Sequence, residues 1–374
     1  MHILFFHTYE YSFKEWERTG TLSRELSYFH KIINEHGFKF TFVSYSDESE
    51  IEFKKFFPNC KIIPVYSLSK KPKNKLVRFL RSLYLPFQLS KMLDLSSIDL
   101  IKQNQLQGAW VSIILKFIIR KPLYIRTGYD VLTFKVKEKK PIYIKLFYYF
   151  LTQFSLAFCN LYSVTSDVDR KFLKKYFIFN VNKIKYLPNF VLSENFENFN
   201  KNKEPIITIG RLEKQKNLSF LIEEFKNSDY HFQHYGEGSE LQNLKQLAKS
   251  NNVKITFNKM IDNKKILEIL KEHTFFINCS FFEGNPKTVL EALSNGCVVF
   301  TSSNKNSVEL VQNNRDGFIF ELEPNKLREK FDDVYNNREL VSTVSRNAYT
   351  NSKRFSLENI VIQEIDQLTQ VVKI

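Results

Sequence analysis

TFFINCSFFEGNPKTVLEALSNGCVVFTS, residues 274–302, contains the most informative fold pattern in this chain. Its two ends are apolar runs rich in Phe, Ile and Val, which are typical of buried strands. Between them, Pro286–Ser294 has apolar residues at helical spacing. Asn295 and Gly296 then end the helix, because Gly readily adopts the left-handed conformation. The stretch therefore predicts a strand, a helix and a second strand that runs parallel to the first.

The same alternation of short apolar runs and helix-period segments continues along the whole chain. Expected strands are His2–His7, Phe40–Ser46, Lys61–Val65, Asp99–Gln105, Leu123–Gly128, Leu161–Ser166, Pro205–Gly210, His231–Gly236, Val253–Asn258, Thr274–Ser280, Cys297–Ser302 and Gly317–Glu321. Expected helices are Leu22–Glu35, Lys73–Leu93, Gly108–Ile119, Ile142–Phe154, Asp167–Tyr176, Asn217–Lys226, Ser239–Lys249, Lys264–Lys271, Pro286–Ser294, Asn325–Asn336 and Phe355–Ile374. This alternation indicates an α/β protein whose parallel sheets are covered on both faces.

The length of 374 residues predicts two domains. We place the linker at Leu187–Pro205, because the run SENFENFNKNKEP is polar, lacks apolar periodicity and ends in Pro. The expected domains are residues 1–190 and 191–354, two Rossmann-like units that face each other across a cleft. Residues 355–374 are expected to form a helix that crosses back to the first domain.

Composition excludes several classes of protein. Hydrophobic residues make up 43% and charged residues 25%, which rules out a disordered, collagenous or coiled-coil chain. The four cysteines (Cys60, Cys159, Cys279 and Cys297) lack metal-ligand or redox spacing, so we expect no metal site and a reducing compartment.

The net charge of +15 is carried by the first half, with 31 Lys and Arg against 15 Asp and Glu up to Phe190. Such asymmetry suggests that this half meets a polyanionic surface, either nucleic acid or acidic lipid.

No segment is typical of a signal peptide or a membrane span. The N-terminal MHILFFHTYE lacks a basic start and a cleavage site, and indicates a buried strand. The uncharged stretch Leu146–Ser166 is too polar for a transmembrane helix, and Asn160 divides it into a helix and a strand. We therefore expect a cytoplasmic protein.

The strongest candidate site surrounds the helix that begins near Pro286. Asn285 is a suitable N-cap, and the free amides near Lys287 and Thr288 suit an anion such as a diphosphate. Glu283 lies just before this helix and Glu291 lies inside it. Carboxylates repel phosphate but accept hydrogen bonds from hydroxyl groups, so this pair predicts a pocket for a nucleotide sugar. The alternative is that Glu283 only solvates a loop and Glu291 lies on the helix surface.

Two cations leave one predicted strand–helix loop in the same half. Arg211 follows Gly210, and Lys216 precedes Asn217, a plausible N-cap. A guanidinium binds phosphate oxygens in pairs and an ammonium adds a compact charge, so both suit a departing diphosphate. Gly236, in the next loop, allows a backbone to approach a ligand. The alternative is that Arg211 and Lys216 are ordinary loop cations.

These motifs carry a resemblance to a known family. GRLEKQKN, YGEGSEL and FEGNPKTVLEALSNG resemble, in order and spacing, the donor-binding domain of retaining GT-B glycosyltransferases of family 4, "glycosyl transferases group 1". IKQNQLQGAW and PLYIRTGYD look like members that act on bacterial surface polysaccharides. The resemblance implies that Glu283 contacts the donor sugar and Glu291 the ribose, while Arg211 and Lys216 bind the diphosphate. It also implies retention by front-face attack, with no metal and no cofactor.

The first half offers candidates for the acceptor side. Arg126 and Asp130 follow an expected strand end, where many family members have a His. His7 ends the first strand and either lines the cleft or lies in the core, and Asp130 is alternatively a helix cap. Gly20 opens the first long helix and is a candidate contact for the donor phosphate or the acceptor, and the alternative is a simple helix start.

The basic half has a candidate partner in an acidic membrane surface. Cations precede aromatic helical segments around Leu83–Leu85 and Phe147–Phe154. We therefore expect peripheral docking at the inner face of the cell membrane, near a lipid-linked or saccharide acceptor. Two alternatives stay open. One is a nucleic-acid-binding protein, although the sequence contains no helix-turn-helix, zinc-finger or RNP pattern that would support it. The other is an inactive relative that only binds sugar nucleotides.

Overall fold

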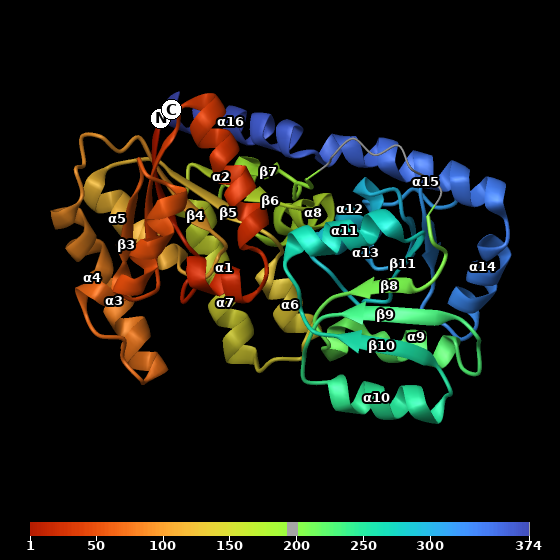
Figure 1. Cartoon of the computed structure of the whole chain (residues 1–374). Helices are drawn as coiled ribbons and strands as arrows, with labels where there is room; N and C mark the ends of the chain where they lie inside the picture. Colours follow the sequence, from red (N-terminus) through yellow and green to blue (C-terminus); the bar gives the residue numbers. More distant parts are fainter. Residues whose placement is uncertain (193–200, 374) are drawn as a thin grey trace. The chain divides into compact units, whose positions relative to one another are not determined.

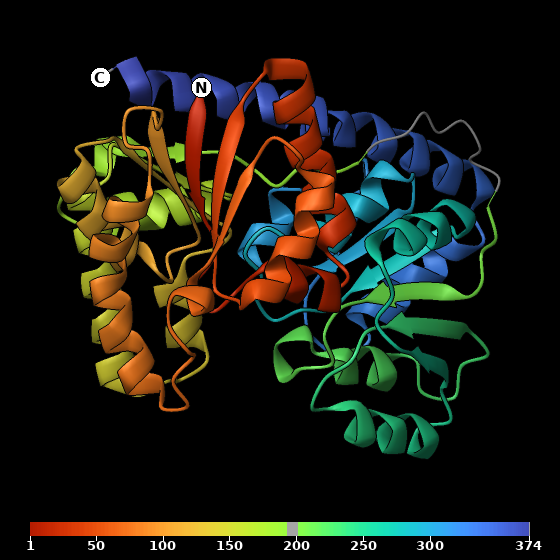
Figure 2. The same ribbon diagram turned by 60° about the vertical axis from the view of Figure 1, so that its left-hand side comes forward.

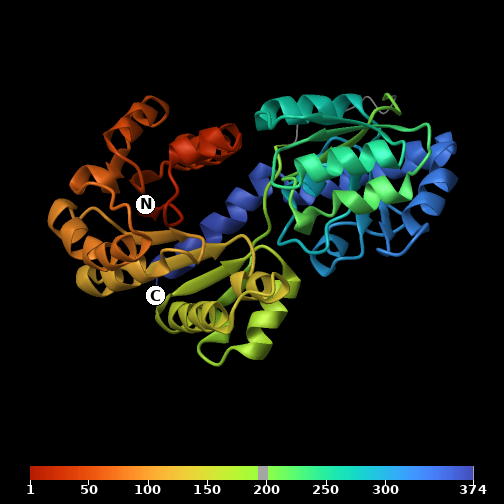
Figure 3. The ribbon, with the colours of Figure 1, turned by 90° about the horizontal axis from the view of Figure 1, so that it is seen from below.

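A computed structural model describes residues 1–192 and 201–373, and these residues form two compact units (Figure 1). The first unit comprises Met1–Leu187 and Val361–Ile374, and the second comprises Pro188–Ile360. The helix α16 (Leu357–Lys373) therefore contributes residues to both units (Figure 3). The expected linker, Leu187–Pro205, includes residues 193–200, which lie outside the described residues.

Within the described residues, the first unit contains a seven-stranded parallel sheet in the order β3-β2-β1-β4-β5-β6-β7. Its strands are β1 (His2–Phe6), β2 (Lys39–Ser44), β3 (Lys61–Pro64), β4 (Leu100–Asn104), β5 (Leu123–Thr127), β6 (Leu161–Val164) and β7 (Ile184–Tyr186). The register pairs Phe5 with Phe42 on one side and with Lys102 on the other. Reversal of strand order at β1 and β4 makes this unit doubly wound.

Helices cover both faces of the first sheet. They are α1 (Phe13–Arg18), α2 (Leu22–His36), η1 (Glu48–Phe56), α3 (Val65–Leu68), α4 (Lys75–Met92), α5 (Ala109–Ile119), α6 (Val131–Lys137), α7 (Ile142–Phe158), α8 (Asp167–Tyr176), η2 (Val181–Lys183) and α16. One core joins the sheet to α4 and α5 through residues such as Leu85, Leu115 and Ile125. α4 and α7 both pack against α5 (Figure 2). α2 and α16 meet on the opposite face, where Tyr28 bonds to Glu364.

The second unit contains, within the described residues, a six-stranded parallel sheet in the order β10-β9-β8-β11-β12-β13. Its strands are β8 (Ile206–Ile209), β9 (His231–Tyr235), β10 (Lys254–Asn258), β11 (Phe275–Asn278), β12 (Val298–Ser302) and β13 (Phe318–Phe320). Its helices are η3 (Lys214–Lys216), α9 (Leu218–Glu224), α10 (Leu241–Ser250), α11 (Asn263–Glu272), α12 (Lys287–Ser294), α13 (Lys305–Val308), α14 (Lys326–Tyr335), α15 (Arg338–Ser352) and η4 (Lys353–Phe355). One core lies beneath α9, α10 and α14, and a second lies beneath α11, α12 and α15.

The predicted α/β class with two Rossmann-like parallel sheets is confirmed. The sequence analysis missed β7, the helices α1, α3, α6, α13 and α15, and the 3-10 segments η1, η2, η3 and η4. β7 has only three residues, Ile184–Tyr186, of which one is buried, so it shows no apolar run. α15 contains Ser, Thr and Asn, which lower helix propensity, and it is stabilised by packing of Val344 and Ala348. α7 also extends to Phe158, beyond the predicted end at Phe154.

Candidate functional site

The candidate site lies in the second unit, where loops follow the carboxyl ends of β8, β9 and β11. The loops after β8 and β9 touch through their backbones. Gly236 has φ 149°, and a Cβ atom there would lie 2.0 Å from the carbonyl oxygen of Gly210. Gly238 is equally constrained, because a Cβ atom there would lie 2.2 Å from the carbonyl oxygen of Leu212. Gly236 and Gly238 thus bring two loops together at the edge where open parallel sheets bind ligands, while the predicted approach of Gly236 to a ligand remains a prediction.

The loop after β8 directs Lys216 towards β11. The Lys216 methylenes pass over Gly210, whose Cβ would meet Lys216 Cε at 3.3 Å. The Phe281 amide donates to the Gln215 carbonyl at 3.0 Å, and Gln215 Nε2 donates to the Phe282 carbonyl at 2.7 Å. These two bonds fasten the β8 loop to the β11 loop.

Glu283 accepts two hydrogen bonds in this position. Lys216 Nζ donates to Glu283 Oε1 at 2.5 Å, and Ser280 Oγ donates to the same oxygen at 2.6 Å. Glu283 is 8% exposed and the Lys216 side chain 19%, so water screens this ion pair only partly. The structure thus brings together two of the predicted site residues. Both bonds end on Oε1, so among the described residues no hydrogen bond to Oε2 competes with a ligand there.

The start of α12 differs from the prediction. The helix begins at Lys287, and Pro286 occupies the N-cap position, so the prediction of Asn285 as N-cap is wrong. The Asn285 side-chain oxygen instead accepts from the Asn189 amide at 3.2 Å, and Asn189 Nδ2 donates to the Asn285 carbonyl at 3.0 Å. Asn285 Nδ2 is buried and has no hydrogen-bond acceptor among the described residues. Since Pro286 has no capping side chain, the first turn of α12 remains a suitable place for an anion.

Glu291 lies inside α12 and is 4% exposed, so the alternative of a surface residue is wrong. Its Oε1 accepts from Asn263 Nδ2 of α11 at 2.8 Å, a partner that the sequence analysis missed. The helix ends as predicted, at Asn295 and at Gly296 with φ 67°. Packing between α11 and α12 therefore fixes the orientation of the second carboxylate.

The other predicted donor-side residues are accessible. Arg211 is exposed and forms no ion pair with any described residue, while Lys287 and Thr288 are half-buried at the start of α12. Asn217 occupies the N-cap position of α9 as predicted, but it has φ 53° and its side chain makes no capping bond. Arg211 is therefore available to a ligand.

His234 was missed by the sequence analysis. It lies on β9 and is 3% exposed, with Nδ1 at 2.7 Å from Thr208 Oγ1 and Nε2 at 2.9 Å from the Gly210 carbonyl oxygen. Burial lowers the pKa of His234 to about 4, so the ring is neutral and donates from Nε2 to that carbonyl. The only signal for it in the sequence is a polar residue inside an apolar strand that ends at Gly236.

In the first unit, the contacts of the predicted acceptor residues are structural. Asp130 accepts from the Thr133 amide at 2.7 Å and caps α6, as its alternative interpretation stated. His7 is fully buried between aromatic rings, with Phe13 and Trp16 at centroid distances of 4.6 and 4.5 Å. Burial lowers the pKa of His7 to about 3, so it is neutral. His7 therefore lies in the core, which was the second of its two predicted positions.

Arg126 joins an ionic cluster and keeps 16% of its side chain exposed, so its role on the acceptor side remains a prediction. Its Nε lies 3.8 Å from Glu364 Oε1, and Lys102 Nζ lies 2.8 Å from the same oxygen. The Tyr28 hydroxyl donates to Glu364 Oε2 at 2.6 Å. Gly20, with φ 64°, forms the turn between α1 and α2, and its predicted contact with a donor remains a prediction.

Comparison with known proteins shows that the candidate site lies within a segment that matches a known protein family. Residues 192–351 match the family described as glycosyl transferases group 1. A relative from Campylobacter jejuni, GalNAc-alpha-(1->4)-GalNAc-alpha-(1->3)-diNAcBac-PP-undecaprenol alpha-1,4-N-acetyl-D-galactosaminyltransferase, is 25% identical over 233 residues. That match covers 59% of this chain and 63% of the relative, so it spans less than two thirds of the relative's length.

Solved structures resemble the whole chain in fold. Sucrose-phosphate synthase from Thermosynechococcus elongatus has a TM-score of 0.79 at 15% identity, over 99% of this chain and 98% of that one. Anabaena HepE, in complex with UDP and glucose, has a TM-score of 0.73 at 16% identity, over 99% of this chain and 100% of that one. The chain therefore has the GT-B fold. The family match and the fold together support a glycosyltransferase.

Proposed function

We propose that this protein is a retaining family 4 glycosyltransferase. It transfers a hexosyl group from a UDP- or GDP-linked sugar to a saccharide or lipid-linked acceptor. The observation that carries the proposal is the Lys216–Glu283 pair beside the open start of α12, with Glu291 buried in the same helix. The activity for which the Campylobacter relative is named and the ligands of Anabaena HepE agree with this class of reaction.

The donor diphosphate would lie at the start of α12, near the amides of Lys287 and Thr288. Arg211, which is exposed, and Lys216 would neutralise its charge. Asn285 Nδ2 is a buried donor without an acceptor among the described residues, and a phosphate or sugar oxygen would satisfy it. Gly236 lets the β9 loop pack against the Gly210 carbonyl, which supports the β8 loop that carries Arg211 and Lys216.

The two carboxylates would recognise hydroxyl groups. Glu283 Oε2 would accept a hydrogen bond from a hydroxyl of the donor sugar while Oε1 stays on Ser280 and Lys216. Glu291, fixed by Asn263, would accept from the ribose. Carboxylates suit these hydroxyl groups because an ionised carboxylate only accepts hydrogen bonds.

In the reaction that we propose, an acceptor hydroxyl attacks the anomeric carbon from the face that the diphosphate leaves. The bond between the anomeric carbon and the diphosphate oxygen breaks, and a departing diphosphate oxygen takes the hydroxyl proton. Arg211, Lys216 and the start of α12 stabilise the developing negative charge, and Glu283 orients the sugar. Since two cations perform this role, we propose that no metal is required.

The test is a direct assay with purified protein and a panel of UDP- and GDP-sugars, in the presence and absence of EDTA. We expect one donor to raise the melting temperature, because a ligand that binds only the native state stabilises it. We also expect slow donor hydrolysis or transfer that EDTA leaves unchanged. Failure of every sugar nucleotide to bind would refute the proposal. Binding without any turnover in the presence of acceptors would favour the alternative of an inactive relative.

We further propose that the first unit docks on an acidic membrane surface. On α4, the exposed apolar residues recur at helical spacing: Leu76, Val77, Leu80, Tyr84 and Phe87. α7 carries a second set: Ile142, Tyr143, Leu146, Phe147, Phe150, Phe154 and Phe158. We call these two sets together the apolar face. The helices are linked by the Phe79–Phe147 ring contact at 6.4 Å.

Charge supports the choice of an acidic surface. The sequence contains no Asp or Glu from Phe53 to Leu93, and Glu138 is the only acid from Val131 to Ser166. The cations beside the apolar face are Lys70, Lys73, Lys75, Lys135, Lys137, Lys139, Lys140 and Lys145. Each cation near an anionic bilayer contributes about 1 kcal/mol. No described helix has the length and apolarity needed to span a bilayer.

These features agree with a role in bacterial surface-polysaccharide synthesis at the inner face of the cell membrane, which we propose as the setting of the reaction. A nucleic-acid-binding function is the competing explanation for the basic half. Flotation with anionic vesicles, alongside gel shifts with DNA and RNA, separates the two. Binding to nucleic acid without binding to vesicles would refute the membrane proposal.

A further inference from the structure

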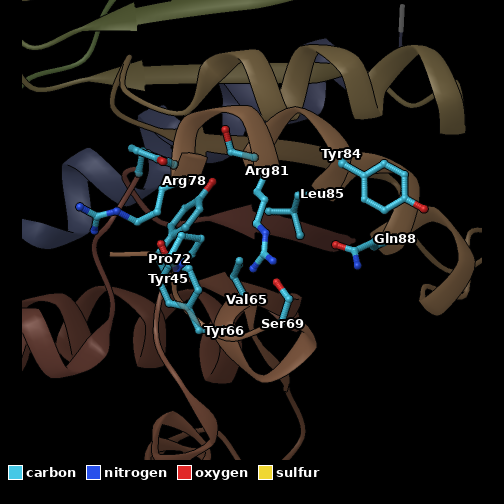
Figure 4. Close-up of a pocket in the computed structure, with 12 residues that line it drawn as sticks. Tyr45, Val65, Tyr66, Ser69, Pro72, Arg78, Arg81, Tyr84, Leu85 and Gln88 are labelled. Carbon is cyan, nitrogen blue, oxygen red and sulfur yellow. The ribbon is translucent and has the colours of Figure 1, made fainter. Parts of the chain in front are cut away.

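A cavity of about 220 Å³ lies in the first unit beyond the ends of three neighbouring strands. Tyr9 follows β1, Tyr45 directly follows β2, and Val65 directly follows β3. The cavity is lined by Tyr9, Tyr45, Val65, Tyr66, Ser69, Pro72, Arg78, Arg81, Ser82, Tyr84, Leu85 and Gln88 (Figure 4). It therefore lies between the carboxyl edge of the sheet and α4, where open parallel sheets bind ligands.

Two arginines of α4 line this cavity, but their charges are used differently. Arg78 Nη1 lies 2.5 Å from Glu10 Oε2, and Lys71 Nζ lies 3.0 Å from the same oxygen, so Arg78 is held in an ion pair and Glu10 balances one of the two positive charges. Arg81 donates from Nη1 to the Lys70 carbonyl at 2.9 Å and has no carboxylate partner among the described residues. Figure 4 shows the Arg81 guanidinium directed towards Ser69, with Arg78 directed away from it. Arg81 is thus a cation available to a ligand.

Tyr45 supplies a second sign of a missing ligand. It is 4% exposed, and its hydroxyl has no hydrogen-bond partner among the described residues. A buried hydroxyl without a partner is costly, and a ligand oxygen would remove that cost. Burial raises the pKa of Tyr45, so the hydroxyl keeps its proton and donates.

The rest of the wall is aromatic. The Tyr9 and Tyr45 rings meet edge to face at a centroid distance of 5.1 Å. The Tyr66 hydroxyl donates to Glu10, which holds that ring in the wall. Aromatic rings offer an apolar surface to the C–H faces of a sugar, while Ser69 and Gln88 add polar groups.

We propose that this cavity binds a phosphate-bearing sugar, the end of the acceptor that lies next to its phosphate. This inference rests on the proposed transferase function and names the chemical class of its acceptor. A guanidinium without a carboxylate suits a phosphate, and the tyrosines suit one sugar ring. The volume is smaller than the roughly 300 Å³ at which pockets for drug-sized ligands begin, so a single sugar phosphate fits better than a long glycan.

The same chemistry has two sources, a free sugar phosphate and a lipid-linked sugar diphosphate. The cavity adjoins the apolar face, because Tyr84 belongs to both. The experiment therefore includes glucose 1-phosphate and, in detergent micelles, a polyprenyl-diphosphate-linked N-acetylhexosamine. Equal affinities would identify the free compound as the source. Binding at least about tenfold tighter for the linked compound would identify the lipid.

Calorimetric titration of the full chain, with UDP in excess to occupy the donor site, tests the pocket. We expect glucose 1-phosphate to bind and methyl glucoside, which lacks the phosphate, to bind at least about tenfold more weakly. Arg81→Gln should weaken glucose 1-phosphate binding about tenfold or more, since a hydrogen bond to a charged group is worth about 1.5–3 kcal/mol. Tyr45→Phe should weaken it several-fold without lowering the melting temperature, because the hydroxyl that it removes is unpaired.

The matched control is Lys91→Gln, which removes one exposed positive charge from the same helix but lies outside the cavity. Equal affinities of Arg81→Gln and Lys91→Gln would overturn the pocket. The pocket would also be overturned if glucose 1-phosphate binding were lost in Arg211→Gln but kept in Arg81→Gln. The compound would then bind at the donor site and not in the cavity. The protein could also bind no sugar nucleotide and still lose its affinity for glucose 1-phosphate in Arg81→Gln. That result would support the pocket and refute the transferase function.

Discussion

Lys216 Nζ and Glu283 Oε1 lie 2.5 Å apart although 67 residues separate them in the chain. This contact joins the loop after β8 to the loop after β11, and Gln215 reinforces it with hydrogen bonds to the Phe281 and Phe282 backbone. A charged pair held in this way positions both groups before a ligand arrives. Catalysis by positioning and charge stabilisation depends on such preorganisation.

Glu283→Gln tests the role of the carboxylate. We expect kcat to fall about 100-fold, because removal of one preorganised polar group from a charge-stabilising site typically costs that much. Affinity for the nucleoside diphosphate should change less than about threefold, since the diphosphate contacts Arg211 and Lys216 in the proposed site. Glu329→Gln, at a carboxylate on an exposed helix face, is the control for the charge change. Equal kcat values in the two variants would remove Glu283 from the mechanism.

His234 acts, in our interpretation, through the Gly210 carbonyl rather than on a substrate. Gln places a donor near the Nε2 position, whereas Asn places its polar group near Nδ1. His234→Gln should therefore keep donor KM within about threefold, and His234→Asn should raise it about tenfold through the lost hydrogen bond.

Thr208→Val provides the complementary variant, because it removes the bond to Nδ1 and leaves the one to Gly210. Its donor KM should stay close to that of His234→Gln. Since the pKa of His234 is about 4, activity should show no titration of this residue between pH 6 and 8. A KM that rises equally in all three variants would point to general destabilisation instead.

Membrane docking is expected to need both the aromatic residues and the cations. Phe150→Ser with Phe154→Ser should weaken binding to vesicles of about one-third anionic lipid, and Lys139→Gln with Lys140→Gln should weaken it about tenfold or more. Added salt should weaken the wild type further. Ile362→Ser is the control, because Ile362 is 53% exposed on α16, away from the apolar face. Flotation unaffected by either double substitution would exclude this surface.

Lys102 and Glu364 form a buried ion pair that we expect to matter for stability. Lys102→Met leaves the Glu364 carboxylate buried without its nearest cation, which typically costs about 3–5 kcal/mol. The double variant Lys102→Met with Glu364→Leu should recover most of that loss, because an apolar pair of similar volume replaces two charges. Both tryptophans, Trp16 and Trp110, lie in the first unit, so Trp fluorescence in urea reports on this unit.

The same cluster predicts a dependence on pH. Burial raises the pKa of Glu364, but the nearby charges of Lys102 and Arg126 outweigh burial and hold that pKa below its usual value. A depressed pKa stabilises the folded state above the unfolded value of about 4.3, and this stabilisation is lost as pH falls through the folded value. The urea concentration at the midpoint of unfolding should therefore decrease in the wild type as the pH is lowered below about 4.3. It should decrease less in the double variant.

Local patterns predicted the fold because strands and helices leave periodic marks in the chain. The apolar runs at Phe275–Asn278 and Val298–Ser302, with Asn295 and Gly296 between them, depend only on neighbouring residues. Both glutamates were identified for a related reason, since they belong to one strand–helix segment, with Glu283 just before α12 and Glu291 inside it. Elements without a burial pattern of their own, such as β7, could not be found in this way.

The amino-acid order alone thus determined the class of fold and the candidate donor-side residues, because both follow from contacts within a few residues along the chain. Tertiary structure alone decided which groups meet across long separations. Lys216 meets Glu283, Asn263 meets Glu291, and His234 meets Gly210 only because parallel strands bring their loops to one edge. Arg126 meets Glu364 for the same reason: α16 returns that carboxylate to the first sheet.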